Sequence, residues 1–235
     1  AAPKTKMLVG KLGELGLSPA NITKYDVSTN PPTQLARTDH GPVGSNLGDF
    51  DLSADGTRIW TACGSPYQIT EIRTSDMKLS GKAYPTGPYP TGVDIATTAG
   101  GEVLLGGTNS IYDKDLHVFD AANPAIFSSY ETGKWSVAGN VAISDDGTRA
   151  YGVHAADYPM GGPGELVTLT RSTGAITRTA ITTAATFNNG IDTDPRSGRV
   201  FVATSNSVSV FTAAGALVGT VPAVAGPGGI VVVPA

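Results

Sequence analysis

The sequence predicts an all-β fold of repeated four-stranded antiparallel units, and two observations support this. The first is composition: 30 of the 235 residues are glycine, 16 are proline and only 15% are charged, which is typical of many short strands joined by tight turns. The second is a turn motif that recurs at nearly regular intervals along the chain. Together they favour a repeat architecture in a single domain over residues 1–235.

The recurring motif is a strand that ends in an acidic or glycine turn, followed by a second strand. It is found at Asp51–Arg58, Asp94–Gly101, Ala142–Arg149 and Asp192–Arg199. The turn glycines are Gly56, Gly101, Gly147 and Gly198, which lie 45, 46 and 51 residues apart. A period of this length is typical of one blade of a β-propeller.

A second hairpin lies between successive motifs, where an alternating strand runs into a polar turn. These strands are Ile22–Val27, Gln68–Ile72, Leu116–Phe119, Leu166–Leu169 and Val208–Phe211. Two hairpins per period give four strands per period. The sequence therefore predicts a β-propeller of five four-stranded blades.

The two ends of the chain are predicted to share the first blade. Lys6–Val9 has the pattern of a second strand with no first strand before it, and Gly229–Val233 that of a first strand with no second strand after it. Pairing these N- and C-terminal strands would close the ring and remove two exposed sheet edges. If the chain is part of a longer protein, the alternative is that further blades lie upstream.

Charge and hydropathy exclude some classes of partner. The formal net charge is -4 and no run of Lys or Arg is present, so nucleic acid is not expected to bind. No apolar stretch approaches the roughly 18 residues that span a bilayer, so membrane insertion is not expected. Cys63, the single cysteine, lies in an apolar strand and is predicted to be a small buried residue without a catalytic role.

Two hairpins carry a family resemblance. Leu52–Trp60 and Ile143–Tyr151 resemble the Asp-Gly hairpins of YVTN-type and lactonase-like propeller repeats, and this resemblance spans nearly the whole chain. Gly44–Asp51 and Tyr84–Pro90 resemble propellers of secreted actinobacterial proteins with Ig-like repeats. The resemblance implies a secreted or cell-surface protein, with flanking domains in a longer chain as one arrangement.

The resemblance does not define a function, because propellers of this style include binding modules and enzymes. Lactonase-like and streptogramin-lyase-like propellers place His, Glu, Asp and Asn residues for catalysis or metal binding on the central face. The present sequence has few such residues in the predicted loops of that face, and no Glu there is paired with a His. This departure argues against both enzyme groups, and no catalytic residue is assigned.

Loop residues on the predicted channel face are candidates for ligand binding. They are Tyr67, Tyr89, Tyr112, Trp135, Tyr158 and Asn188. Three of the tyrosines occupy matching positions just before a third strand, where an exposed ring could stack on a sugar or anchor a partner protein. The alternative is that each ring packs over the edge of its own blade.

Three carboxylates occupy the same point of the first strand in different blades: Asp51, Asp94 and Asp192. If they converge at the channel, their oxygens could bind calcium; no other cofactor is expected. The alternative is that each carboxylate accepts hydrogen bonds from a neighbouring backbone and braces one blade against the next. The histidines, His40, His117 and His154, are scattered over three blades and are predicted to be structural.

These features lead to three functional hypotheses. The first is a non-catalytic extracellular binding or scaffolding module that recognises a glycan or a cell-surface protein through the channel-face loops. The second is a metal-dependent hydrolase or lyase with its site at the central channel, where Asp51, Asp94, Asp192 and His40 would be the candidates. The third is a purely structural spacer in a larger cell-surface protein.

Overall fold

The computed structural model describes residues 6–11, 20–39, 47–64, 67–87, 90–108, 116–132, 141–155, 163–184, 190–204, 206–222 and 232. In this part of the chain all regular structure is β-strand, which confirms the predicted all-β class. None of the described residues forms a helix long and apolar enough to cross a membrane.

The described strands form five antiparallel sheets in which neighbours in sequence are neighbours in space. The first sheet contains β1 (Lys6–Lys11), β2 (Asn21–Asp26) and β3 (Thr33–Asp39). The second contains β4 (Leu47–Leu52), β5 (Arg58–Gly64), β6 (Tyr67–Arg73) and β7 (Lys78–Pro85). The third contains β8 (Pro90–Thr98), β9 (Gly101–Thr108), β10 (Leu116–Asp120) and β11 (Phe127–Tyr130).

The last two sheets repeat the same plan. The fourth contains β12 (Val141–Ile143), β13 (Arg149–Ala155), β14 (Pro163–Thr170) and β15 (Ala175–Ala184). The fifth contains β16 (Ile191–Thr193), β17 (Val200–Ala203), β18 (Ser207–Phe211) and β19 (Leu217–Pro222). The predicted repeat of two hairpins per period is therefore confirmed in four of the five sheets.

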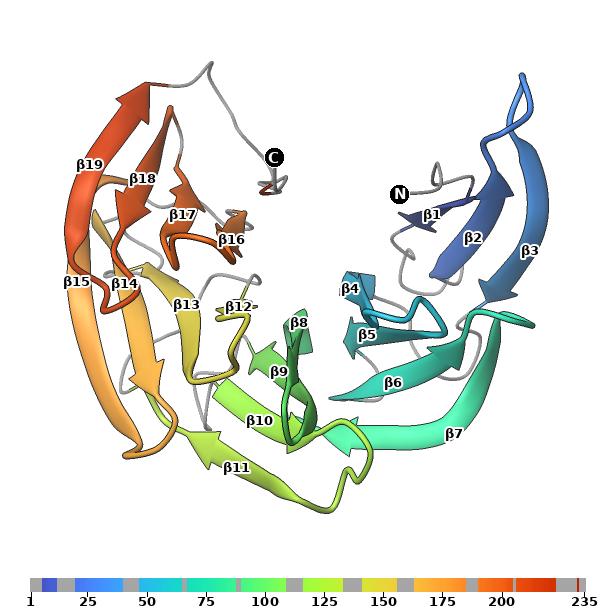
Figure 1. The fold of residues 1–235 in the computed structure, drawn as a ribbon, viewed down its shortest axis with the longest axis horizontal. Coiled ribbons are helices and arrows are strands. Elements are labelled where there is room, and N and C mark those ends of the chain that lie inside the picture. The colour runs from blue at the N-terminus through green and yellow to red at the C-terminus, as the bar shows by residue number, and fades with distance from the viewer. Residues whose placement is uncertain are drawn as a thin grey trace.

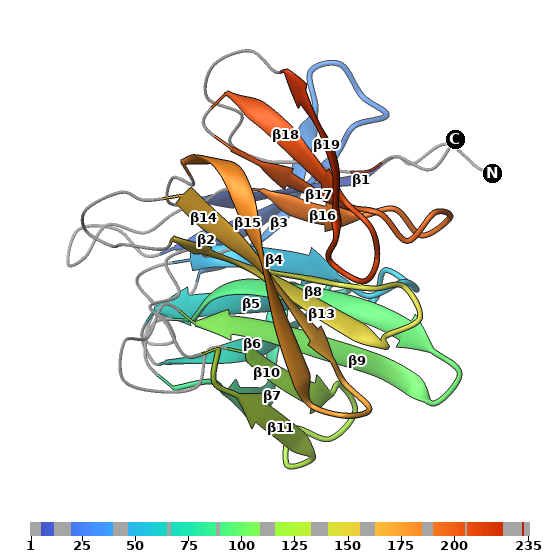
Figure 2. The ribbon, with the colours of Figure 1, turned by 90° about the vertical axis from the view of Figure 1, so that its left-hand side faces the viewer.

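The sheets follow one another around a common centre (Figure 1). Strands β4, β8, β12 and β16 lie nearest the centre, and β3, β7, β11, β15 and β19 lie at the perimeter. Seen from the side, each sheet is twisted and is rotated relative to the next (Figure 2). This arrangement is consistent with a β-propeller.

The four predicted turn glycines all have positive φ angles, which side chains with a Cβ rarely adopt. These angles are 71° at Gly56, 119° at Gly101, 67° at Gly147 and 66° at Gly198. Glycine is therefore required by the backbone at each point where a first strand turns into a second strand.

The hydrophobic core lies between adjacent sheets, since inner strands are covered on both faces. Trp60, Tyr84, Leu104 and Phe119 form one fully or almost fully buried cluster between the second and third sheets. Cys63 lies in another cluster, and burial raises the pKa of its thiol to about 11, as expected for an unreactive core residue.

The first sheet has three strands among the described residues, with β1 as its inner edge. Met7 and Val9 on this strand are each 42% exposed. The predicted C-terminal strand at 229–233 lies outside the described residues except for Val232. The pairing of β1 with a C-terminal strand therefore stays a prediction.

Candidate functional site

The carboxylates on the inner strands join neighbouring sheets. One oxygen of each accepts a backbone N–H from the next inner segment: Asp51 Oδ2 from Ile95 N at 3.1 Å, Asp94 Oδ2 from Ile143 N at 2.7 Å, and Asp192 Oδ2 from Val232 N at 2.6 Å. The other oxygen accepts the N–H of the following residue in its own strand, at 2.7 to 2.8 Å. This is the bracing arrangement that the sequence offered as the alternative to metal binding.

The fourth sheet has Ala142 at the position of these aspartates, and its contact with the fifth sheet is reversed in direction. Thr193 Oγ1 in β16 donates a hydrogen bond to the carbonyl oxygen of Ile143 in β12, at 3.3 Å. A side chain on the later strand thus replaces the side chain that the earlier strand lacks.

Asp51 and Asp94 are hydrogen-bonded to each other. Burial, followed by the charge of Asp51, raises the pKa of Asp94 well above its usual range. Burial also raises the pKa of Asp51, and the charge of Asp192 acts in the same direction. Burial and the neighbouring charge therefore both favour the protonated form of Asp94, which can donate a hydrogen bond to Asp51.

Asp49 belongs to the same group, although it was not among the residues predicted from sequence. It lies two residues before Asp51, so the alternation of side chains along a strand was a signal that could have identified it. Its carboxylate accepts N–H groups from Val93 at 3.2 Å and Phe50 at 2.9 Å. Burial is the main cause that raises the pKa of Asp49 to about 7.

Metal binding by these carboxylates remains a prediction. Within the described residues, no group of three or more His, Cys, Asp or Glu side chains is placed to hold a metal ion. Two histidines are buried among hydroxyl groups: His117 Nδ1 lies 2.9 Å from Ser129 Oγ, and His154 Nε2 is hydrogen-bonded to Thr132 Oγ1. His40 lies outside the described part of the chain.

Only one predicted ligand-binding residue can be placed. Tyr67 is the first residue of β6, and its side chain is 44% exposed. Tyr89, Tyr112, Trp135, Tyr158 and Asn188 lie outside the described residues.

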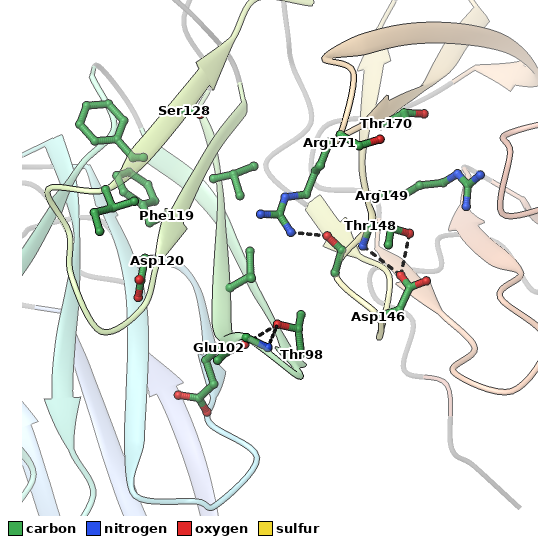
Figure 3. Close-up of a pocket in the computed structure, with 18 of the residues that line it drawn as sticks. Thr98, Glu102, Phe119, Asp120, Ser128, Asp146, Thr148, Arg149, Thr170 and Arg171 are labelled. Atoms are coloured by element: carbon green, nitrogen blue, oxygen red, sulfur yellow. Dashed lines mark hydrogen bonds between the residues drawn. The ribbon is translucent and has the colours of Figure 1, made fainter.

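A cavity of about 750 Å³ lies between the third and fourth sheets (Figure 3). It is lined by residues of the turns that follow the first and third strands, such as Thr98, Asp120, Asp146 and Arg171. In an antiparallel sheet these turns lie at the end opposite to the loops that follow the second and fourth strands. The cavity is therefore on the face opposite to the predicted ligand loops. We refer to it as the inter-sheet groove.

No protein-family model matches the chain, and no curated protein matches it in sequence. Solved structures do match, among them the Kuenenia stuttgartiensis hydrazine synthase, with a TM-score of 0.66 and 13% identity over 94% of this chain and 75% of that chain. A putative 6-phosphogluconolactonase from Bacteroides uniformis has a TM-score of 0.66 and 15% identity, over 98% and 72% of the two chains. A structure of a nidogen/laminin complex matches with a TM-score of 0.62 and 12% identity, over 86% of this chain and 72% of that chain.

Identities this low show a shared fold alone. As many as 558 chains of solved structures match, so the fold is common and does not by itself identify an activity. The fold and the inner carboxylates define an all-β protein of successive antiparallel sheets, consistent with a β-propeller, whose sheets are joined by side-chain to backbone hydrogen bonds.

Proposed function

We propose that this protein is a non-catalytic extracellular binding or scaffolding module that recognises a glycan or a protein surface through the loops on its channel face. The observation that carries the proposal is that both oxygens of Asp51, Asp94 and Asp192 accept backbone N–H groups. Carboxylates used in this way hold sheets together, and they are poorly available for acid or base chemistry. An exposed ring at Tyr67 is suited to stacking on a ligand.

The proposal includes a ring of five four-stranded blades, with the first blade completed by N- and C-terminal strands. Val232 supports it, because its N–H reaches Asp192 as the N–H of Ile95 reaches Asp51 and that of Ile143 reaches Asp94. Val232 thus takes part in the contact that first-strand residues make in two other sheets. The same proposal includes a family relationship between this chain and proteins with YVTN-type or lactonase-like repeats.

Binding of the whole chain to arrays of immobilised glycans and of cell-surface proteins tests the proposal. We expect at least one immobilised glycan or cell-surface protein to bind, and Tyr67→Ala to weaken that binding at least tenfold. Leu35→Ala is the matched control, since Leu35 is similarly exposed at 48% but lies in a perimeter strand. Binding that Tyr67→Ala leaves unchanged would contradict a role for the channel-face loops at this position.

A metal-dependent hydrolase or lyase is the second candidate, and the raised pKa values of Asp49, Asp51 and Asp94 favour it. Perturbed pKa values of neighbouring carboxyl groups are a feature of many active sites. Lactone and ester substrates, assayed with and without calcium, test this candidate. Turnover that Asp94→Asn abolishes without unfolding the protein would support an enzyme and overturn the binding module.

A further inference from the structure

The contact between the second and third sheets shows how two neighbouring sheets are closed at the turn face. Arg58 forms an ion pair with Glu102, and its guanidinium carbon lies 5.2 Å from the centre of the Trp60 ring. Tyr84 donates its hydroxyl hydrogen to the carbonyl oxygen of Ala121, at 2.7 Å. An ion pair and a hydrogen bond therefore join these two sheets.

Strand pairing identifies the equivalent positions one sheet later. The first-strand residues Asp51, Asp94 and Ala142 pair with Trp60, Leu105 and Tyr151 of the second strands. Val103 lies two residues before Leu105, as Arg58 lies two residues before Trp60, so Val103 is equivalent to Arg58. Thr148 lies three residues before Tyr151, as Glu102 lies three residues before Leu105, so Thr148 is equivalent to Glu102.

A third position also differs, in the turn that follows the third strand of each sheet. Ala121 N donates to the carbonyl oxygen of Glu102 and Arg171 N to that of Thr148, so Arg171 occupies the position of Ala121. At these positions Val103 and Thr148 form no ion pair, and the inter-sheet groove lies at this contact. The Arg58–Glu102 ion pair thus distinguishes the contact between the second and third sheets from the contact between the third and fourth.

The groove combines a donor, acceptors and an aromatic surface. Arg171 donates one N–H to the carbonyl oxygen of Gly147, and its guanidinium points into the space between the two sheets (Figure 3). Phe127 pairs with Phe119, whose ring packs on Tyr84 in the core between the second and third sheets, so the Phe127 ring lies on the other face of the third sheet, away from the groove. The aromatic surface of the groove is that of Tyr130, which is half-buried and packs on the core between the third and fourth sheets.

Carboxylates and hydroxyl groups complete the lining. Asp120 and Asp146 accept backbone N–H groups of their own turns. Hydrogen bonds from Ser144 and Thr148 hold the pKa of Asp146 below its usual value, so its carboxylate is charged at neutral pH. Thr98, Thr148 and Ser128 add hydroxyl groups. The groove is thus lined by both positively and negatively charged side chains. This mixture does not favour a ligand that is strongly positive or strongly negative.

We propose that the inter-sheet groove binds a neutral saccharide. Sugar hydroxyl groups both donate and accept hydrogen bonds, so Arg171 and the carboxylates of Asp120 and Asp146 can each be used. The apolar face of a sugar ring can pack on Tyr130. The cavity volume of about 750 Å³ is within the roughly 300–1,000 Å³ of ligand sites. This site does not rest on the channel-face proposal, because it lies on the opposite face.

The test uses the whole chain and five neutral hexasaccharides: cellohexaose, maltohexaose, xylohexaose, mannohexaose and chitohexaose, with binding measured by calorimetry. We expect at least one hexasaccharide to bind, and Arg171→Ala and Tyr130→Ala each to weaken that binding at least tenfold. Arg178→Ala, an exposed arginine of the same sheet, and Val218→Ala, an exposed apolar residue that is 51% accessible, are matched controls that should not change affinity.

A second variant keeps the test decisive if the single variants unfold. Val103→Arg combined with Thr148→Glu recreates the Arg58–Glu102 pair in the groove, and we expect it to abolish binding while the unfolding temperature is maintained. No binding of any hexasaccharide would overturn the proposal, as would binding that the groove variants leave unchanged. Loss of binding in Tyr67→Ala alone would overturn the groove and support the channel face.

Discussion

The carboxylate of Asp94 accepts the backbone N–H of Ile143 at 2.7 Å, and so joins the inner strand of the third sheet to that of the fourth. The side chain of Asp94 also meets Asp51. One residue therefore connects three consecutive sheets, from β4 through β8 to β12, close to the centre of the molecule.

Replacing Asp94 with alanine is expected to destabilise the fold by about 2–3 kcal/mol, because buried N–H groups lose a charged or strongly polar acceptor. Urea unfolding measures this change. Asp145→Ala is the control, since Asp145 is an exposed turn residue and its removal should cost below about 0.5 kcal/mol. Equal losses in the two variants would contradict the bracing role of Asp94.

The pH dependence of stability should reflect Asp49. Its pKa is about 7 in the folded protein, against an ordinary value of 3.8 that we take for the unfolded chain, so between these values the folded state binds more protons than the unfolded state. Stability from this residue is therefore greatest below about pH 4 and falls as pH rises towards 7, by on the order of 2–4 kcal/mol.

Asp49→Asn isolates this contribution, because asparagine does not titrate. We expect denaturant unfolding at pH 5 and pH 8 to show a smaller stability difference in the variant than in the original protein. An unchanged difference would assign the pH dependence to other groups. Asp55 changes stability in the opposite direction, since its pKa is lowered to about 2 by hydrogen bonds from Ser53 and Thr57, and its contribution is lost as pH falls through that value.

Two turn glycines with almost the same backbone angle should differ in their tolerance of alanine. At Gly56 a Cβ would meet nothing within 4 Å, so only the positive φ angle opposes it, at about 1 kcal/mol. At Gly147 the Cβ would lie 2.6 Å from Thr98 Cγ2 in the neighbouring sheet, so we expect a loss of about 2–3 kcal/mol. Thermal unfolding of Gly56→Ala and Gly147→Ala checks this order, and equal losses would contradict the inter-sheet contact.

The repeat could be predicted from sequence because its signals are local. A glycine such as Gly56 or Gly147 is required by its own φ angle, and the turn acids Asp55 and Asp146 accept N–H groups from residues two positions later. The position of Asp51, Asp94 and Asp192 in the first strand followed from the same register. Each of these features depends on a few consecutive residues.

The inter-sheet groove could not be predicted in this way. It depends on Val103, Thr148 and Arg171, which lie in different hairpins. Their role is recognised only by comparison with the equivalent residues of the preceding pair of sheets, which are Arg58, Glu102 and Ala121. That comparison needs the register to single-residue accuracy. The general behaviour of propellers led to the prediction of ligand binding by loops on the opposite face. Most of the residues predicted in those loops lie outside the described part of the chain.

Calcium should have little effect on thermal unfolding. Both oxygens of Asp51, Asp94 and Asp192 already accept backbone N–H groups, and a cation would have to displace them. We expect the unfolding midpoint with calcium to match the midpoint with a chelator within about 1 °C. A clear rise with calcium would support the predicted metal site, because a ligand bound only by the folded state stabilises it.

Two tyrosines at equivalent positions provide a final comparison. Tyr84 pairs with Ile69 and Tyr130 with Leu116, which places both at the same point of their perimeter strands. The Tyr84 hydroxyl donates to the carbonyl oxygen of Ala121 at 2.7 Å and lies 3.4 Å from Glu71 Oε2, whereas Tyr130 lines the inter-sheet groove. The same side chain therefore closes one pair of sheets and borders an open space in the next.

Tyr84→Phe should destabilise the protein by about 1–2 kcal/mol, because the buried carbonyl oxygen of Ala121 loses its donor. Tyr130→Phe should cost less than about 0.5 kcal/mol, because no hydrogen bond of this kind joins Tyr130 to the fourth sheet within the described residues. Urea unfolding of the two variants measures both values. A loss in Tyr130→Phe as large as that in Tyr84→Phe would mean that the third and fourth sheets are closed by the same contact as the second and third, and it would remove the structural basis of the groove.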